Sequence, residues 1–426
     1  MTNIISLFRS LDRGQRLVIS ATVWGNTLPW FEIYLFPFWV PILSQVFFNS
    51  QTPLFNLIGA FVIFGSGFLA RPLGALFFGH MGDKIGRKQT FIRTIVLVTF
   101  PTFFIGCLQP YSDWGIWSPI LLAVLRLAQA VPIAGEVPGT VCYLYEYATR
   151  SNRLFMTSWA GFGNQIGAIL AIIESFLMKN LASYEFLLHW GWRISFWIGG
   201  LLGILGIYLR KKLHETRPFE ELKDHNLLEK LSAFKVVKNN IGKIIQGTAY
   251  GVLNASTFYL IATYIPTYFI NVLNLNNNLA MIISILILIL TTVLLPYFGM
   301  VGDKMLNKNK QLLIYCAYSV IVLLIPLYYS ISCSNLGLMF VVGFLYIIPV
   351  TCLTALLAYR IAHLFPTAIR FTGFGISFNI ADGIFGGFTP AISILLTHYT
   401  GNEAGFCWYI LFCAIISLWS YYKIKD

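Results

Sequence analysis

Charged side chains are scarce in this chain of 426 residues. Asp, Glu, Lys and Arg together supply 11% of the sequence, whereas 57% of it is hydrophobic. A soluble domain needs far more charge than this to cover its surface. The composition therefore excludes a soluble protein and indicates a chain that crosses a membrane many times.

Cysteine is scarce as well, and it is never paired in the sequence. Seven cysteines are scattered singly, nearly all within apolar runs and without a C-x-x-C spacing: Cys107, Cys142, Cys316, Cys333, Cys352, Cys407 and Cys413. This pattern argues against a disulfide framework and against a cysteine metal site. We expect the protein to use neither a metal nor a cofactor.

Sequence patterns typical of enzymes are also missing. We find no H-E-x-x-H, P-loop, G-x-S-x-G or D-x-x-x-D pattern, and the loops are too short for a catalytic domain. A membrane enzyme is therefore disfavoured. We also expect no cleavable signal, because residues 1–16 form a basic amphipathic lead-in and the first apolar run is too long for one.

Long apolar runs, in contrast, are abundant. Runs of 18 or more residues occur about twelve times, near 17–40, 55–79, 91–109, 118–147, 154–177, 193–209, 244–270, 279–300, 311–331, 336–358, 371–396 and 404–421. A helix that rises about 1.5 Å per residue crosses a hydrocarbon core of about 30 Å at these lengths. Because the runs are continuous and do not alternate, they exclude a β-barrel. We predict an all-α integral membrane protein with twelve transmembrane helices.

Basic residues are distributed unevenly between the loops. If the N-terminus is cytoplasmic, about 25 of the 29 Lys and Arg fall in the two tails and in the loops after even-numbered spans. This asymmetry predicts that both termini are cytoplasmic. It also accounts for the net charge of +12 as a topology signal helped by anionic lipid. We therefore expect a lipid bilayer, and no nucleic acid, as a partner.

One polar interval divides the chain. Residues 210–243 form the longest polar stretch, between the sixth and seventh spans. We predict a six-helix bundle at 1–209, a cytoplasmic linker at 210–243 and a second six-helix bundle at 244–426. Apolar residues recur in the linker at spacings of three to five, which predicts one or two short amphipathic helices. A partly ordered linker is the alternative.

A repeated loop links the two halves. GHMGDKIGRK at 79–88 returns as GMVGDKMLNK at 299–308, so that Asp83 and Asp303 lie 220 residues apart in matching contexts. A half-length repeat is implied. Six plus six spans related by pseudo-symmetry is the plan of transporters whose two bundles rock about a midplane site.

These loops are predicted to form a cytoplasmic gate. Glycine permits close approach of helix ends, and Asp83 is expected at the N-terminus of the third span, where the helix dipole favours an anion. We expect Glu136 and Glu146 to form gate ion pairs with Arg71, Arg150 or Arg153, with a proton relay as the alternative. The predicted gate residues are Arg71, Gly79, Gly82, Asp83, Lys84, Gly86, Arg87, Lys88, Glu136, Glu146, Arg153, Gly299, Asp303, Lys304 and Arg370.

The first of these loops resembles a known family signature. G-x-x-x-D-[RK]-x-G-[RK]-[RK] between the second and third spans is similar to the signature loop of the major facilitator superfamily. The chain further resembles the metabolite:H+ symporter family, which includes proline/betaine, shikimate and dicarboxylate carriers. The segments that carry this resemblance are ARPLGALFFG (70–79), RLAQAVPIAGE (126–136), GWRISFW (191–197), LFPTAIRFTGFG (364–375) and FGGFTP (385–390). The resemblance covers about residues 16–422 and implies the major facilitator fold and a transport function.

The chain departs from the family pattern in three places. The first-span motif G-N-x-x-E-W-[FY]-D-F has Pro29 in place of its first acid and Glu32 in place of its second. The fourth-span motif keeps its Arg, Gln and Glu but replaces two glycines by alanine. His363 stands where E-L-F-P-T has its acid. We expect Pro29 to kink the first span, and the lost carboxylate leaves the proton stoichiometry open.

Three charged residues lie deep in the predicted spans. Counted from the cytoplasmic ends, Glu32 lies about 22 Å deep, Arg126 about 18 Å and Asp382 about 20 Å. Each needs a partner or a function, because burial of a charge at this depth costs at least about 2.5–3.5 kcal/mol.

The shared depth predicts proton coupling. We predict Glu32 as the main proton carrier, with Arg126 and Asp382 as further coupling residues. Glu32 and Arg126 are both expected to line the cavity. Burial favours the neutral form of Glu32, whereas Arg126 favours its charged form, so a solute at Arg126 changes the balance. A structural ion pair between Glu32 and Arg126 is the alternative.

Polar and aromatic side chains predict the solute site. The candidates are Asn26, Trp30, Tyr34, Arg126, Gln129, Asn254 and Tyr264. A carboxylate on Arg126 and a quaternary or ring nitrogen over an aromatic face suit a zwitterionic osmolyte or a mono-anionic metabolite. Packing explains most of the aromatics equally well.

We therefore predict a proton-coupled symporter that imports a small organic solute by alternating access. An uncoupled uniporter or exchanger is the transport alternative, and a non-transporting membrane sensor is a further one. We expect a monomer in a bacterial inner membrane, with the solute and protons as its partners.

Overall fold

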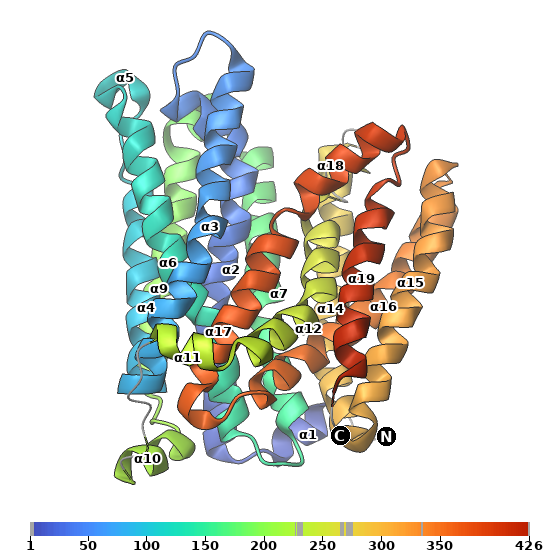
Figure 1. The fold of residues 1–426 in the computed structure, drawn as a ribbon. Helices are drawn as coiled ribbons and strands as arrows, with labels where there is room; N and C mark the ends of the chain where they lie inside the picture. Colours follow the sequence, from blue (N-terminus) through green and yellow to red (C-terminus); the bar gives the residue numbers. More distant parts are fainter. Residues whose placement is uncertain are drawn as a thin grey trace.

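The computed structural model describes residues 4–225, 227, 233–264, 268–269, 276–333 and 335–424. All regular structure within these residues is helical. Long helices run side by side through the molecule, and α1 and the last turns of α19 lie at the same end of it (Figure 1). We call this end the terminus-bearing face and the other end the opposite face.

The first half of the chain supplies six long helices and four short ones. They are α1 (Ile4–Ser10), α2 (Arg13–Phe47), α3 (Pro53–Ile85), α4 (Arg87–Ile105), α5 (Tyr111–Trp114), α6 (Trp117–Tyr147), α7 (Arg153–Leu181), α8 (Tyr184–Phe186), η1 (Leu187–Gly191) and α9 (Trp192–Lys211).

The second half follows the same plan with more interruptions. Its elements are α12 (Ile241–Tyr259), η2 (Leu260–Tyr264), α14 (Asn277–Lys304), η3 (Leu306–Lys308), α15 (Asn309–Ser332), α16 (Leu336–His363), η4 (Thr367–Ile369), α17 (Arg370–Ile380), η5 (Ala381–Gly386), α18 (Thr389–Thr400) and α19 (Phe406–Tyr422). Each of the twelve predicted apolar runs is helical over most of its described residues; the exceptions are 106–109, 387–388 and 404–405. Within the described residues, nine helical stretches are long and apolar enough to cross a membrane by themselves, and α4, α12 and α19 occupy the other three runs.

Local signals fix several helix ends. The Asp12 carboxylate accepts the Gln15 N–H at 2.7 Å at the start of α2, and the Asn335 side chain accepts the Leu338 N–H at 3.0 Å at the start of α16. Both are N-caps, which satisfy backbone donors that the helix leaves free. Gly86, at φ 115°, separates α3 from α4, and this backbone conformation favours glycine.

The helices form two groups that meet along the middle of the molecule. In the first half α2 packs on α7, and α6 packs on both α3 and α4. In the second half α15 packs on α16, and α12 packs on α19. The halves meet where α7 packs on α14 and α3 packs on α17. These pairings give the two six-helix bundles that the repeat predicts.

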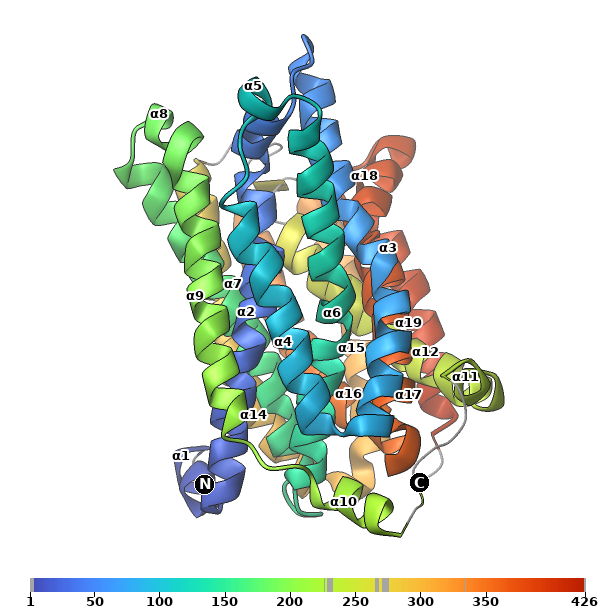
Figure 2. The same ribbon diagram turned by 90° about the vertical axis from the view of Figure 1, so that its left-hand side faces the viewer.

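The polar interval contains two short helices, as predicted. They are α10 (Arg217–Asp224) and α11 (Ala233–Asn239), and α10 lies at the terminus-bearing face (Figure 2). The bounds 1–209, 210–243 and 244–426 for the three regions stay a prediction. A π-helical segment, η5, interrupts the eleventh span, and π-bulges of this kind are often found at functional sites.

Candidate functional site

A small cavity of about 80 Å³ lies between the two halves. The polar side chains that line it are Asn164, Gln165, Asn254, Thr354 and Asp382. Trp30 and Phe258 add aromatic faces and pack edge to face, with ring centroids 5.4 Å apart. Because Trp30 belongs to α2 and Phe258 to α12, this contact joins the two halves.

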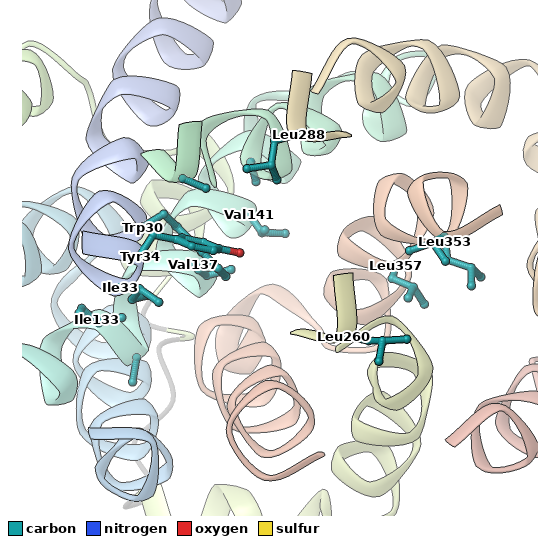
Figure 3. Close-up of a cluster of buried hydrophobic side chains, with 14 of the residues drawn as sticks. Trp30, Ile33, Tyr34, Ile133, Val137, Val141, Leu260, Leu288, Leu353 and Leu357 are labelled. Carbon is teal, nitrogen blue, oxygen red and sulfur yellow. The ribbon is translucent and has the colours of Figure 1, made fainter. Parts of the chain in front are cut away.

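Several buried polar atoms around this cavity have no hydrogen-bond partner among the described residues. Trp30 Nε1 and Gln165 Oε1 belong to residues that line it, whereas Tyr34 Oη and Asn26 Oδ1 belong to residues that contact the lining residues Trp30 and Asn164. Figure 3 shows Trp30 and Tyr34 side by side, near Val137 and Val141. Buried polar atoms nearly always have partners, so these atoms suit contacts with a polar solute.

The predicted substrate-binding residues differ in their positions. Trp30 and Asn254 line the cavity, and Asn254 Oδ1 accepts a hydrogen bond from the Thr354 hydroxyl at 2.6 Å. Asn26 donates to the Ala160 carbonyl at 3.1 Å and to the Asn164 side chain. The side chain of Tyr264 lies outside the described part of the structure.

Glu32 is fully buried inside the first bundle. Gln129 Nε2 donates to Glu32 Oε2 and, at 2.8 Å, to the Thr102 hydroxyl. Arg126 in turn donates to Gln129 Oε1 at 2.8 Å. Gln129 therefore stands between Glu32 and Arg126, and within the described chain no ion pair joins the two directly.

Neither Glu32 nor Arg126 lines the central cavity, so that expectation is wrong for this structure. Arg126 faces a separate cavity of about 10 Å³, which Arg71 and Gln129 also line. The Arg126 guanidinium stacks 4.3 Å from the ring centroid of Phe36, and its Nε has no hydrogen-bond partner among the described residues.

Arg71 and Asp382 form an ion pair across the two halves. Arg71 on α3 donates to Asp382 on η5 at 2.6 Å, and both side chains are about 6% exposed. The Tyr259 hydroxyl donates to the same carboxylate oxygen at 3.2 Å. Arg71 was predicted as a gate residue that pairs with Glu136 or Glu146. That partner prediction is wrong, because its carboxylate comes from the wall of the central cavity.

The repeated aspartates cap helices of the opposite half. Asp83, near the end of α3, accepts the N–H groups of Phe371 and Thr372 at 3.1 and 2.9 Å, at the start of α17. Asp303, near the end of α14, accepts those of Leu154 and Phe155 at 2.9 and 2.8 Å, at the start of α7. The prediction that Asp83 caps the third span is wrong. The helix dipole argument holds for the helix that is actually capped.

Glycine permits this approach on both sides of the pseudo-symmetry. A Cβ atom added to Gly79 would lie 2.7 Å from the backbone Cα of Thr372, and one added to Gly299 would lie 2.8 Å from the carbonyl of Leu154. Backbone atoms cannot move aside easily, so only glycine fits. Gly82 is packed in the same way against the ring of Phe371.

Arg87 is the centre of a charged cluster at the same face. It pairs with Asp83 and Glu146, each at 3.3 Å, and donates to the Thr367 carbonyl of the second half at 2.5 Å. Arg370 of the second half pairs with Glu146 at 2.6 Å. All of these side chains are buried or nearly so, and the cluster ties the halves together.

The remaining gate residues have other surroundings. Glu136 pairs with Arg210 of its own half at 2.5 Å, so its predicted arginine partners are wrong. The Arg153 guanidinium lies 4.8 Å from the ring centroid of Tyr145. Lys84 and Lys304 are exposed, and Lys88 donates its backbone N–H to Glu215 at 3.1 Å.

Sequence reasoning missed part of this gate. Glu215, in the linker, accepts the backbone N–H groups of Arg87 and Lys88, and burial raises the pKa of its carboxyl above its ordinary value. The Thr216 hydroxyl donates to Glu146 at 2.5 Å. Local sequence patterns could not predict these contacts, because they join positions about 70 to 130 residues apart.

The second half contributes a histidine to the same face. The Tyr145 hydroxyl and His363 Nδ1 are hydrogen-bonded at 2.7 Å, and Tyr359 stacks on the histidine ring at 5.3 Å. The departure of His363 from the family motif was the signal that could have singled it out. The hydrogen bond between Tyr145 and His363 joins α6 of the first half to α16 of the second.

Comparison with known proteins agrees with this architecture. The profile of the Major Facilitator Superfamily matches residues 17–378. The chain is 32% identical to a proline/betaine transporter of Escherichia coli K12 over 98% of its own length and 85% of the relative. It is 30% identical to a citrate-proton symporter of Klebsiella pneumoniae over 92% and 88% of the two chains.

Solved structures give the same fold. A structure of the proton:xylose symporter XylE superposes with a TM-score of 0.80 at 14% identity, covering 97% of this chain and 96% of the other. The fold and the relatives define a multi-pass membrane transporter and not an enzyme. The chain belongs to the Major Facilitator Superfamily, and its relatives match the metabolite:H+ symporter family within it.

Proposed function

We propose that the protein is a proton-coupled symporter that imports a small zwitterionic osmolyte or mono-anionic metabolite by alternating access. The observation that carries the proposal is the buried Glu32, joined through Gln129 to Arg126. An acid at this depth of a membrane protein is a functional site by default. The names of the relatives, a proline/betaine transporter and a citrate-proton symporter, support the same class.

Glu32 is the proposed proton carrier. Its Oε2 accepts a hydrogen bond, whereas its Oε1 is buried and has no partner in the described part of the chain. An ionised carboxylate with a free oxygen is costly in such surroundings, and protonation removes that cost. Arg126, one side chain further away, stabilises the ionised form. The balance between the two forms gives a site that loads and unloads a proton.

The central cavity supports a solute without a large net charge. Asp382 is the charged residue among its described lining, and Arg71 neutralises it. The faces of Trp30 and Phe258 suit a quaternary or ring nitrogen, and the amides of Asn164 and Gln165 suit its polar end. A tricarboxylate would find too few cations here.

We further propose that the terminus-bearing face is cytoplasmic. The asymmetry of the basic residues supports this orientation. The bacterial relatives support a bacterial inner membrane. All the functional groups of the proposed mechanism come from one chain. We propose a monomer embedded in lipid. The ties between the halves at the terminus-bearing face then correspond to a conformation closed to the cytoplasm.

Uptake into proteoliposomes tests the proposed function. The purified protein is given labelled glycine betaine, proline and citrate, with and without an inward proton gradient. We expect one of the zwitterions to accumulate only with the gradient and to leak out after addition of a protonophore. Equilibration without accumulation would support a uniporter, and uptake that requires a solute inside would support an exchanger. Failure to move any of the solutes would contradict the proposal.

A further inference from the structure

The proton site and the cavity are separated in this structure. Glu32 lies inside the first bundle, whereas the cavity is lined by Asp382 from the second. A solute in the cavity therefore does not touch Glu32. Coupling between solute and proton needs a group that the solute can reach.

Asp382 is such a group. It lines the cavity, and behind it Arg71 lines the smaller cavity beside Arg126. The Arg71 guanidinium is held 4.4 Å from the ring centroid of Phe68, so it is fixed in place on the first half. A carboxylate that entered from the central cavity would meet Arg71 at the position that Asp382 now occupies.

We propose that the carboxylate of the solute replaces Asp382 on Arg71, and that Asp382 takes up a proton when this happens. The proposal rests on the proposed function and deepens it, because it makes Arg71 the anchor of the solute carboxylate. An arginine holds a carboxylate well through its fork of N–H donors. This exchange on Arg71 requires a solute that carries a carboxylate.

Burial makes the exchange and the protonation a single event. Without Arg71, an ionised Asp382 would be a buried charge without a counter-ion, which is strongly unfavourable. The proton comes from the aqueous side on which the solute enters, and it leaves when Asp382 returns to Arg71. Among the described residues, the other titratable groups near Asp382 are Tyr259 from α12 and Tyr34 from α2, and neither supplies a positive charge.

The exchange also releases the two halves from each other. The Arg71–Asp382 pair joins α3 to η5 and shares no residue with the charged cluster around Arg87. When the solute occupies Arg71, this tie across the halves is broken. The solute and the proton together therefore permit the rocking of the bundles, and neither does so alone.

The test measures the affinity of the purified protein for labelled glycine betaine, proline and citrate at pH 6, 7 and 8. The variants are Asp382→Asn, Arg71→Gln and the double variant, and the exposed Asp224→Asn serves as a control. In the unchanged protein we expect binding to weaken as the pH rises, by up to about tenfold per pH unit for each proton.

Asp382→Asn is expected to bind the solute at least threefold more tightly than the unchanged protein at pH 8. Its affinity should also depend less steeply on pH, by the equivalent of one proton taken up on binding. Arg71→Gln is expected to lose the preference for glycine betaine over choline, which has no carboxylate. A merely structural pair would give weaker binding with an unchanged pH profile, and that result would overturn the inference.

The double variant is used if Asp382→Asn does not fold. It removes both charges of the pair, so neither Arg71 nor Asp382 leaves an unpaired charge in the interior. It is expected to bind glycine betaine and choline equally, and a retained preference would overturn the inference. If the unchanged protein binds and accumulates none of the three solutes, the proposed function fails and the inference fails with it. If it accumulates one of them while Asp382→Asn keeps the full pH profile, only the inference fails.

Discussion

The deeply buried charges among the described residues differ in how completely their polar atoms are paired. Arg87, Glu146 and Arg370 form a saturated cluster that spans the two halves. Glu32 and Arg126 keep one unpartnered atom each among the described residues. The first arrangement ties the two halves together, whereas the second leaves polar atoms that a proton or a ligand could contact.

The burial of Glu32, Arg126 and Asp382 follows from their places inside apolar spans, whereas their partners could not be predicted from the sequence. Helix length and rise set how far a residue lies from a helix end. Which residue faces it depends on how two halves pack, and Arg71 and Asp382 are 311 positions apart in the chain. Gln129 was predicted to bind substrate, yet it connects two charges inside one bundle.

The pH dependence of linker docking is a prediction at the residue scale. The linker is docked when Glu215 accepts the backbone N–H groups of Arg87 and Lys88. Burial in this docked state raises the pKa of the Glu215 carboxyl, so the carboxyl keeps its proton to a higher pH than it does in a linker released into water. Docking is therefore favoured below the ordinary carboxyl pKa and loses this contribution as the pH rises through the raised value. Hydrogen exchange of residues 213–219, measured from pH 4 to pH 8, should show protection that falls with rising pH.

Glu215→Gln removes the titrating group and should give a nearly flat profile across this range. Glu220→Gln changes an exposed carboxyl of the same linker and should leave the slope unchanged. An unchanged slope in Glu215→Gln would show that another group controls the docking.

At the scale of elements, the gate consists of helix ends that are capped by the other half. α17 begins at the carboxylate of Asp83 and α7 begins at that of Asp303. The repeated loop predicted that these ends meet, because glycine and aspartate recur at matching positions. The loop sequence could not predict that each aspartate caps a helix of the other half, because the same loop sequence is compatible with a cap on either helix.

Removal of either cap should shift the protein away from the closed state. Replacement of an N-cap by alanine costs about 1 kcal/mol, which corresponds to about a fivefold change in population. Asp83→Ala should have the larger effect, because Asp83 also pairs with Arg87. Distances between spin labels at the exposed positions 84 and 304, measured in a background without native cysteines, should lengthen in both variants.

Asp224→Ala, at an exposed end of α10, is the control and should leave the distance distribution unchanged. If Asp83→Ala and Asp303→Ala gave the same distribution as the control, the caps would not hold the closed state.

At the scale of the whole molecule, two similar bundles meet around one cavity but are not equivalent. The first half supplies Arg87 and Glu146 to the gate. In the second half Asn307 stands at the position of Arg87 in the repeated loop, and His363 lies seven residues before Arg370, as Glu146 lies seven residues before Arg153. The gate is therefore strongly charged on one side of the pseudo-symmetry and weakly charged on the other. Glu32 and Arg126 likewise belong to the first half alone.

The predicted topology can be checked by labelling from one side of the membrane. Single cysteines at positions 84 and 304 should react from the same side, because both lie at the ends of helices at the terminus-bearing face. A cysteine in place of the exposed Ser112 on α5, at the opposite face, should react from the other side (Figure 1). Reaction of positions 84 and 304 from opposite sides would contradict the parallel repeat.

Movement of protons with the solute is the most direct test of the account. Proteoliposomes that contain a pH-sensitive dye are given an inward gradient of the transported solute and no pH gradient. We expect the lumen to acidify as the solute enters. Glu32→Gln should reduce the number of protons that enter with each solute, leaving the proton carried by Asp382, while exchange of labelled solute continues. Entry of the solute without any change in lumenal pH in the unchanged protein would contradict proton coupling.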